Sequence, residues 1–254
     1  MENEPSPELA ILFDFYERLP RKGPGSKAST LRALELLKQL PSEPRVVDFG
    51  CGGGASTLPL AEAGCRVSAV DIHQPFLDEV MTAARAAGLS DRITTHAADM
   101  GEPPFPNESF DLIWAEAAIY NIGFNEGLKR WRPLLRSGGK IAVSEVTWLS
   151  DSPPQEIVEF WHREYPAITM IAENEERLVN AGFKLIDSFP LPMQDWADYY
   201  EPQQIELDRY RTEHADDPTA QAVMDALQEE IDVWRRYGEH YGYVFYLGEK
   251  KLAD

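Results

Sequence analysis

The chain has 254 residues, of which 43% are hydrophobic and 26% are charged. These values are typical of a folded domain that can bury a sizeable core. The 43 acidic residues outnumber the 24 basic residues and leave a formal net charge of −19. Because so acidic a chain repels polyphosphates and anionic lipid surfaces, nucleic acids and membranes are both disfavoured as partners.

Two cysteines, Cys51 and Cys65, are too few for a disulfide framework, and their spacing is not that of a metal site. We therefore expect free thiols, no bound metal and a reducing compartment. Residues 1–5 are acidic and lack an apolar signal core, and no apolar stretch reaches the roughly 18 residues that a membrane span needs. The expected location is the cytoplasm.

The first 44 residues are expected to form a helical N-terminal lid. Apolar residues recur at helical spacing over 9–16, and a second apolar stripe runs over 28–40. Between them, residues 20–26 contain two prolines and two glycines, which oppose the continuation of a helix. Ser26 is a suitable N-cap for the second helix. A loop of this kind before a capped helix suits a mobile closure.

Strands and helices are expected to alternate over residues 45–149. The strands are predicted at 45–48, 66–71, 93–97, 110–115 and 140–146, and the helices at 55–63, 75–87 and 125–135. This alternation predicts an α/β fold in which helices cover both faces of a doubly wound, mostly parallel sheet.

The pattern changes after residue 149. Residues 150–182 combine prolines with large aromatic residues, and residues 190–240 contain a polar helical insertion. We expect these two segments to form helical cap insertions over the sheet edge. Two further strands are predicted at 183–189 and 241–248. The whole chain, residues 1–254, is then a single domain.

A glycine-rich turn follows the first expected strand and opens a helix. It runs Gly50-Cys51-Gly52-Gly53-Gly54-Ala55. Glycine lets the backbone approach a ligand closely because it has no Cβ, and a helix N-terminus presents free amides to that ligand. By itself the G-x-G-x-x-A pattern is weak evidence, and it equally fits a dinucleotide-binding turn.

Acidic residues follow the next three strands. Asp71 ends the second strand, about twenty residues after the loop, where a carboxylate can accept from ribose hydroxyls. Asp99 and Met100 follow the third strand, where a carboxylate and a backbone N–H can meet an adenine ring. Glu116 follows the fourth strand. Because the carboxyl ends of parallel strands face one crevice, these residues and the glycine loop predict a single nucleotide site.

With these motifs the chain resembles the class I S-adenosylmethionine-dependent methyltransferases. The matching stretches are 46–54, 69–72, 99–100 with 104–105, 110–115 and 135–141. The resemblance implies a seven-stranded sheet whose last strand is antiparallel, and it makes residues 45–149 the cofactor-binding core. The stretch 116–124 also resembles one found in uncharacterised bacterial methyltransferases, which leave the substrate open.

The resemblance also assigns the cofactor-binding residues. Asp48, Gly50, Cys51 and Gly52 would pass against the methionine and ribose portions of S-adenosylmethionine, whose product is S-adenosylhomocysteine. Asp71 with Ile72 would bind the ribose, and Asp99 with Met100 the adenine. Glu116 is hypothesised to hold the methionine amino group. The acidic Asp48 favours this family over nicotinamide-binding proteins, which usually have an apolar residue at this position.

The methyl acceptor is expected to be a small molecule. Some relatives hold a nucleobase or amide nitrogen with an Asn/Asp-Pro-Pro-Tyr stretch, which is absent from residues 114–117 here. Candidates for the acceptor pocket are Tyr16, Tyr120, Asn121, Glu145, Trp148, Trp161, His162 and Tyr165. Among them Glu145, His162 and Tyr120 are weak candidates for catalysis, because alignment alone can drive methyl transfer without a general base.

Two other functions stay open from the residues alone. A NAD-dependent oxidoreductase uses the same glycine turn and the same ribose-binding aspartate. A non-catalytic module would bind the cofactor without transferring a methyl group. The sequence does not distinguish a monomer from a homodimer, and it does not identify the acceptor atom.

Overall fold

A computed structural model describes residues 6–251 of the chain. The prediction that the chain lacks an N-terminal signal rests on residues 1–5 and so falls outside the described part. Within residues 6–251, no helix has both the length and the apolar composition to cross a membrane.

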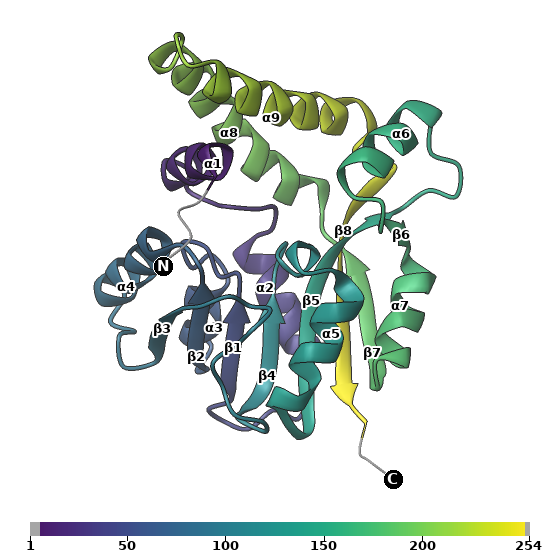
Figure 1. Ribbon diagram of the computed structural model, residues 1–254. Coiled ribbons are helices and arrows are strands. Elements are labelled where there is room, and N and C mark those ends of the chain that lie inside the picture. Colours follow the sequence, from purple (N-terminus) through teal and green to yellow (C-terminus); the bar gives the residue numbers. More distant parts are fainter. Residues whose placement is uncertain (1–5, 252–254) are drawn as a thin grey trace.

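The described residues contain eight strands in one sheet (Figure 1). They are β1 (Arg45–Phe49), β2 (Arg66–Asp71), β3 (Ile93–Ala97), β4 (Phe110–Ala115), β5 (Leu135–Trp148), β6 (Thr169–Met170), β7 (Phe183–Pro190) and β8 (Tyr241–Lys250). Seven of them follow the order β3-β2-β1-β4-β5-β8-β7, and the unexpected two-residue β6 pairs with the end of β5. The last strand, β8, is antiparallel to both of its neighbours. The predicted sheet is confirmed.

Helices cover both faces of this sheet. They are α1 (Pro7–Glu17), α2 (Lys27–Leu36), α3 (Thr57–Glu62), α4 (Gln74–Ala86), α5 (Phe124–Trp131), α6 (Gln155–Glu164), α7 (Ile171–Asn180), α8 (Met193–Glu213) and α9 (Pro218–Tyr237), with the 3-10 turns η1 (Ile119–Asn121) and η2 (Arg132–Leu134). Successive strand residues point to opposite faces. Val46 therefore packs in one hydrophobic cluster, with α2, α3 and α4, and Val47 packs in the other, with α5 and α7.

A helical cap lies above the carboxyl ends of the parallel strands. Figure 1 shows α1, α8 and α9 stacked there, with α6 beside them. Aromatic side chains join these helices: the rings of Phe15 and Tyr210 are 5.6 Å apart, and the hydroxyls of Tyr16 and Tyr199 are 3.0 Å apart. The N-terminal helix and residues 193–237 thus form one layer. In contrast, α7 packs against the sheet, where Leu178 joins the same cluster as Phe183.

Prolines explain the main differences from the predicted elements. The bounds of helix α6 were not predicted within the expected helical cap segment, because that segment is rich in proline. Pro154 is its N-cap and Pro166 follows its end, so these prolines bound the helix and do not interrupt it. The helix predicted to reach residue 135 ends at Trp131, because Pro133 has no amide to continue it. Strand β5 then begins earlier than predicted.

Candidate active site

The order of the strands reverses between β1 and β4. The chain moves from β1 to β2 and β3 on one side, and then to β4 and β5 on the other. Ligands of open α/β sheets bind at such a point, outside the carboxyl ends of the strands. Here these two strands end immediately before Gly50 and Glu116. The topology therefore places a ligand crevice between the glycine loop and the residues after β4.

The glycine loop is wedged tightly between its neighbours. Gly50 and Gly52 have φ angles of 65° and 50°, which favour glycine. A Cβ atom added to Gly50 would lie 2.5 Å from the Cβ of Ala118 and 3.1 Å from Cε of Met100. The amide of Cys51 donates to the carbonyl of Val70 at 3.1 Å. The ends of β2, β3 and β4 therefore converge on this loop.

Asp48 anchors the helix that follows the loop. Its side chain is fully buried, and Oδ2 accepts from the hydroxyls of Ser56 at 2.8 Å and Thr57 at 2.6 Å. Within residues 6–251, Oδ1 has no hydrogen-bond partner. Burial raises the pKa of this carboxyl to about 7. A direct contact between Asp48 and a cofactor stays a prediction.

Asp71 ties the end of β2 to the glycine loop. Its two oxygens accept from the amides of Gly52 and His73, each at 3.0 Å. A carboxylate offers about four acceptor positions, so both oxygens can still accept from ribose hydroxyls. The neighbouring Ile72 is 58% exposed, which provides apolar surface beside this carboxylate.

Asp99 and Met100 follow β3, and Met100 reaches the glycine loop. Oδ1 of Asp99 accepts from the amide of Gly101 at 2.7 Å, and the side chain is exposed. The carbonyl of Met100 accepts from the indole of Trp131 at 2.8 Å, and its Cε reaches Gly50. The structure therefore brings Met100 to the glycine loop, as the motif predicts, with an exposed carboxylate beside it.

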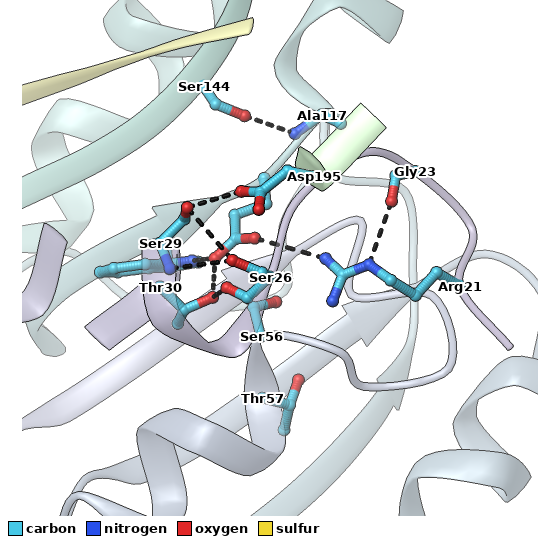
Figure 2. A network of polar contacts seen from close by, with 12 residues as sticks. Arg21, Gly23, Ser26, Ser29, Thr30, Ser56, Thr57, Ala117, Ser144 and Asp195 are labelled. Carbon is cyan, nitrogen blue, oxygen red and sulfur yellow. Dashed lines mark hydrogen bonds and ion pairs between the residues drawn. The ribbon is translucent and has the colours of Figure 1, made fainter. Parts of the chain in front are cut away.

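Glu116 connects β4 to the N-terminal segment. Oε1 accepts from the hydroxyl of Thr30 at 2.7 Å and from the indole of Trp114 at 2.9 Å, while Oε2 lies 3.9 Å from Nη2 of Arg21. Figure 2 shows that Arg21 also donates to the carbonyl of Gly23. Burial raises the pKa of the Glu116 carboxyl. Glu116 thus holds the segment that covers the crevice.

That segment, residues 20–25, lies directly over the glycine loop. Nζ of Lys22 contacts both the carbonyl of Leu19 and the carboxylate of Glu79 at 2.9 Å. A cavity of about 60 Å³ is left between the segment, the loop and Glu116. This volume is far below the roughly 300 Å³ of the smallest usual ligand sites. Residues 20–25 therefore fill most of the space beside the glycine loop, and the predicted mobility of this segment stays a prediction.

Two further cavities continue under the cap. The inner cavity, of about 140 Å³, shares Lys22, Gly23, Pro24 and Ala117 with the cavity at the glycine loop. Its other lining residues are mostly aromatic: Tyr16, Tyr120, Trp161, Trp196, Tyr199, Tyr243 and the acidic Glu230. The outer cavity, of about 350 Å³, shares Tyr120, Trp161, Glu230 and Tyr243 with the inner one. The three cavities thus adjoin one another, from the glycine loop to the helices of the cap.

Several of the residues predicted for the acceptor pocket meet at these cavities. Tyr16, Tyr120, Trp161 and Tyr165 line one or both of them. Four further lining residues, Trp196, Tyr199, Glu230 and Tyr243, were not predicted, because nothing in their local pattern indicates that α8, α9 and β8 meet over the crevice. For Trp196, Tyr199 and Tyr243 the only signal in the sequence was the aromatic content of residues 196–200 and 241–246, and Glu230 had none.

The other predicted residues lie elsewhere. His162 is exposed on α6 and lines none of the three cavities, while Trp148 is buried in the core. Asn121 donates to the carbonyl of Ala118. Glu145 is 1% exposed and accepts from the hydroxyl of Tyr165 through Oε1. Glu145 therefore supports a lining residue of the outer cavity without lining it.

Comparisons with known proteins agree with this geometry. Residues 46–139 match the family model described as a methyltransferase domain. The chain is 31% identical over 104 residues to methyltransferase GfsG of Streptomyces halstedii, and 34% identical over 122 residues to aklanonic acid methyltransferase DauC of Streptomyces sp. (strain C5). These alignments cover 40% and 44% of this chain but 37% and 54% of the relatives, so the chain spans about half of their length or less.

Longer alignments come at lower identity. The uncharacterized methyltransferase YodH of Bacillus subtilis is 24% identical over 89% of this chain and 93% of its own length. A methyltransferase of Geobacter sulfurreducens in complex with S-adenosylhomocysteine superposes with a TM-score of 0.78 at 20% identity, covering 94% of this chain and 98% of the other. YjhP of E. coli gives a TM-score of 0.83 at 17% identity, covering 95% and 99%. These structural likenesses show the fold.

Residues 46–139 are therefore similar to a methyltransferase domain, and the described residues have the fold of an S-adenosylmethionine-dependent methyltransferase. GfsG, DauC and YodH are all named as methyltransferases, so a NAD-dependent oxidoreductase is not favoured. The cyclase SpnF has the same fold with a TM-score of 0.72, at 19% identity over 97% of this chain and 93% of its own. Because one fold can carry different reactions, the reaction of this protein depends on the residues at its site.

Proposed function

We propose that this protein transfers the methyl group of S-adenosylmethionine to a small-molecule acceptor. The adjacency of the cavities carries the proposal, because the cavity at the glycine loop of a methyltransferase domain shares four lining residues with a mostly aromatic cavity under the cap. Residues of the cap helices line these cavities, and the volume of the outer one, about 350 Å³, suits a small molecule. Relatives such as the aklanonic acid methyltransferase are named for small acceptors, which supports this substrate class.

The cofactor would lie across the ends of β1, β2 and β3. Asp71 would accept from the ribose hydroxyls, with the exposed Ile72 against the adenine ring. Asp99 would accept from the adenine amino group, with Met100 beneath the ring. The backbone of Gly50, Cys51 and Gly52 would face the methionine portion of the cofactor, and Glu116 would lie near its amino group. Asp48 would hold the start of α3 through Ser56 and Thr57.

Alignment is the main catalytic contribution that this site can supply. Methyl transfer is an in-line displacement, and holding acceptor, methyl carbon and sulfur in line supplies up to about 7–11 kcal/mol. Residues 20–25, which cover the glycine loop, would exclude water once the cofactor is bound. Tyr120 stays a candidate for orienting the acceptor, since it lines both the inner and the outer cavity.

S-adenosylhomocysteine should raise the melting temperature of the protein, and NAD should not, because a ligand that binds the folded state stabilises it.

Asp71→Asn should weaken S-adenosylhomocysteine binding about tenfold or more, since hydrogen bonds to a charged acceptor contribute roughly 1.5–3 kcal/mol. Asp78→Asn, in an exposed residue of α4, is the matched control and should bind normally. Stabilisation by NAD alone would overturn the cofactor assignment.

The reaction itself is tested with methyl-labelled S-adenosylmethionine and a cell extract, followed by mass spectrometry of small molecules. Label in a small molecule supports the proposal. Label confined to nucleic acid or protein would contradict it, and binding without transfer to any molecule would favour a non-catalytic module.

We also propose that the N-terminal lid, within residues 1–44, opens to admit the cofactor. Lys22→Ala removes the contacts of Nζ with Leu19 and Glu79. It should raise the dissociation rate of S-adenosylhomocysteine about fivefold, since a typical hydrogen bond contributes roughly 1 kcal/mol. Stopped-flow displacement measures this rate. Lys27→Ala, which breaks an exposed ion pair with Glu62, should leave it unchanged; equal rates in all three proteins would refute the lid.

Location and assembly are further parts of the proposal. Cys51 and Cys65 are free and buried, which supports a reducing compartment such as the cytoplasm. The net charge of −19 supports a role without nucleic acid. Light scattering of the purified protein distinguishes a monomer from a homodimer.

A further inference from the structure

The inner cavity has a lining that selects the charge of its ligand. Six aromatic side chains surround it: Tyr16, Tyr120, Trp161, Trp196, Tyr199 and Tyr243. The rings of Trp196 and Tyr243 stack with their centroids 5.3 Å apart. The face of an aromatic ring carries negative potential and attracts a cation, most strongly where water is excluded. Such a lining favours a positively charged group over a neutral or negative one.

Glu230 adds a carboxylate to this lining. It borders the inner and the outer cavity, and its Oε1 accepts from the hydroxyl of Tyr200 at 2.6 Å. Among residues 6–251, no group donates to Oε2 and no basic side chain pairs with Glu230. The other charged lining residue, Lys22, already contacts Glu79. Glu230 therefore brings to the inner cavity a carboxylate of which one oxygen has no partner among residues 6–251.

The outer cavity has the same sign of charge. Its charged lining residues, Glu164, Glu229 and Glu230, are all acidic. Arg163 pairs with the first two at 2.7 and 2.8 Å, and these side chains are about half exposed, so water screens the pairs. Leu12, Phe160 and Leu227 provide apolar surface. An anion entering here would meet like charge, whereas an apolar cation would meet complementary surfaces.

We propose that the methyl acceptor is an amine on an apolar body. Its nitrogen enters the inner cavity beside Glu230 and the aromatic rings, and its body lies in the outer cavity. This inference rests on the proposed methyl transfer and names its substrate class. The inner volume of about 140 Å³ suits an amino head group, and the outer volume of about 350 Å³ suits a body of one or two rings.

The lining also suits the chemistry of an amine. An ammonium group that enters first gives one proton to Glu230, a carboxyl whose pKa burial raises. The lone pair of the neutral nitrogen then forms the N–C bond as the C–S bond of S-adenosylmethionine breaks and its electron pair passes to sulfur. The positive charge moves from sulfur to nitrogen. The aromatic rings therefore face the atom on which charge develops.

Binding of matched probes tests this inference without turnover. Phenethylamine, phenethyl alcohol and hydrocinnamate share one apolar body and differ in charge, and phenethyltrimethylammonium mimics a fully methylated product. Each is titrated by calorimetry into the protein saturated with S-adenosylhomocysteine. We expect the amine and the quaternary ammonium to bind at least about tenfold more tightly than the alcohol, and the carboxylate to bind most weakly.

Two variants compare the carboxylate of Glu230 with that of its neighbour Glu229. Glu230→Gln keeps an acceptor for Tyr200 and should weaken both cationic probes about tenfold, with the alcohol unchanged. Glu229→Gln, the matched control at the outer cavity, should have little effect because its partner Arg163 is exposed. Trp161→Phe keeps a ring and should bind the quaternary probe better than Trp161→Leu.

The outcomes distinguish this inference from the proposed function. If S-adenosylhomocysteine binds but the alcohol or the carboxylate equals the amine, the amine assignment is wrong and the methyltransferase assignment stands. An equal loss for all probes in Glu230→Gln also overturns it. If S-adenosylhomocysteine itself does not bind, the proposed function fails first.

Discussion

Gly50→Ala is expected to abolish measurable binding of S-adenosylhomocysteine and to lower the free energy of unfolding by roughly 2–4 kcal/mol. Two physical effects add at this position. The φ angle of 65° is unfavourable for alanine, and the new Cβ would lie 2.5 Å from the Cβ of Ala118. Ala118 is buried in the turn after β4, so we expect the loop to move and its amides to leave the crevice. Calorimetry and urea unfolding measure the two losses.

Gly88→Ala tests the effect of an unfavourable φ angle alone, without a steric clash of the new Cβ. Gly88 follows α4 with a φ angle of 70°, and no atom lies within 4 Å of the position that its Cβ would take. This variant should lose only about 1–2 kcal/mol of stability, the penalty for a left-handed alanine, and should bind S-adenosylhomocysteine normally. Normal binding by Gly50→Ala would show that the loop does not approach the cofactor.

Glu145→Gln should become more stable than the natural protein as the pH rises. Glu145 is buried on β5, and burial raises its pKa from 4.5 to about 8. The folded state therefore binds this proton more tightly than the unfolded state. The stability that the protonated group contributes is fully present below about pH 4.5 and is lost as the pH rises through about 8. Glutamine is neutral throughout and still accepts from Tyr165.

The expected difference is on the order of 4 kcal/mol above pH 8 and close to zero near pH 4.5. Urea unfolding at intervals between pH 5 and pH 9 measures it. The control is Glu239→Gln, whose carboxylate is 83% exposed and should give a curve parallel to that of the natural protein. A constant offset between Glu145→Gln and the natural protein would mean that Glu145 does not titrate in this range.

Much of the sheet and the cofactor crevice followed from the sequence. Strands β2, β3 and β4 occupy the predicted residues, because each is a short run bounded by glycine, proline or acidic residues. The glycine loop, Asp71 and Glu116 could be placed together because parallel strands direct their carboxyl ends to one crevice. Local periodicity and backbone conformation carry this information, so it can be read without knowing distant contacts.

The aromatic cavity was decided only by the tertiary structure. Tyr16, Trp161, Trp196 and Tyr243 come from α1, α6, α8 and β8, and in each local pattern an aromatic residue is equally suited to an ordinary core. Which of them face a cavity depends on how the cap folds back over the strands. His162 and Trp161 are adjacent in sequence, yet the first is exposed and the second lines the site. The long-range packing of the helices decides which of these residues line the cavity, and local sequence patterns do not predict that packing.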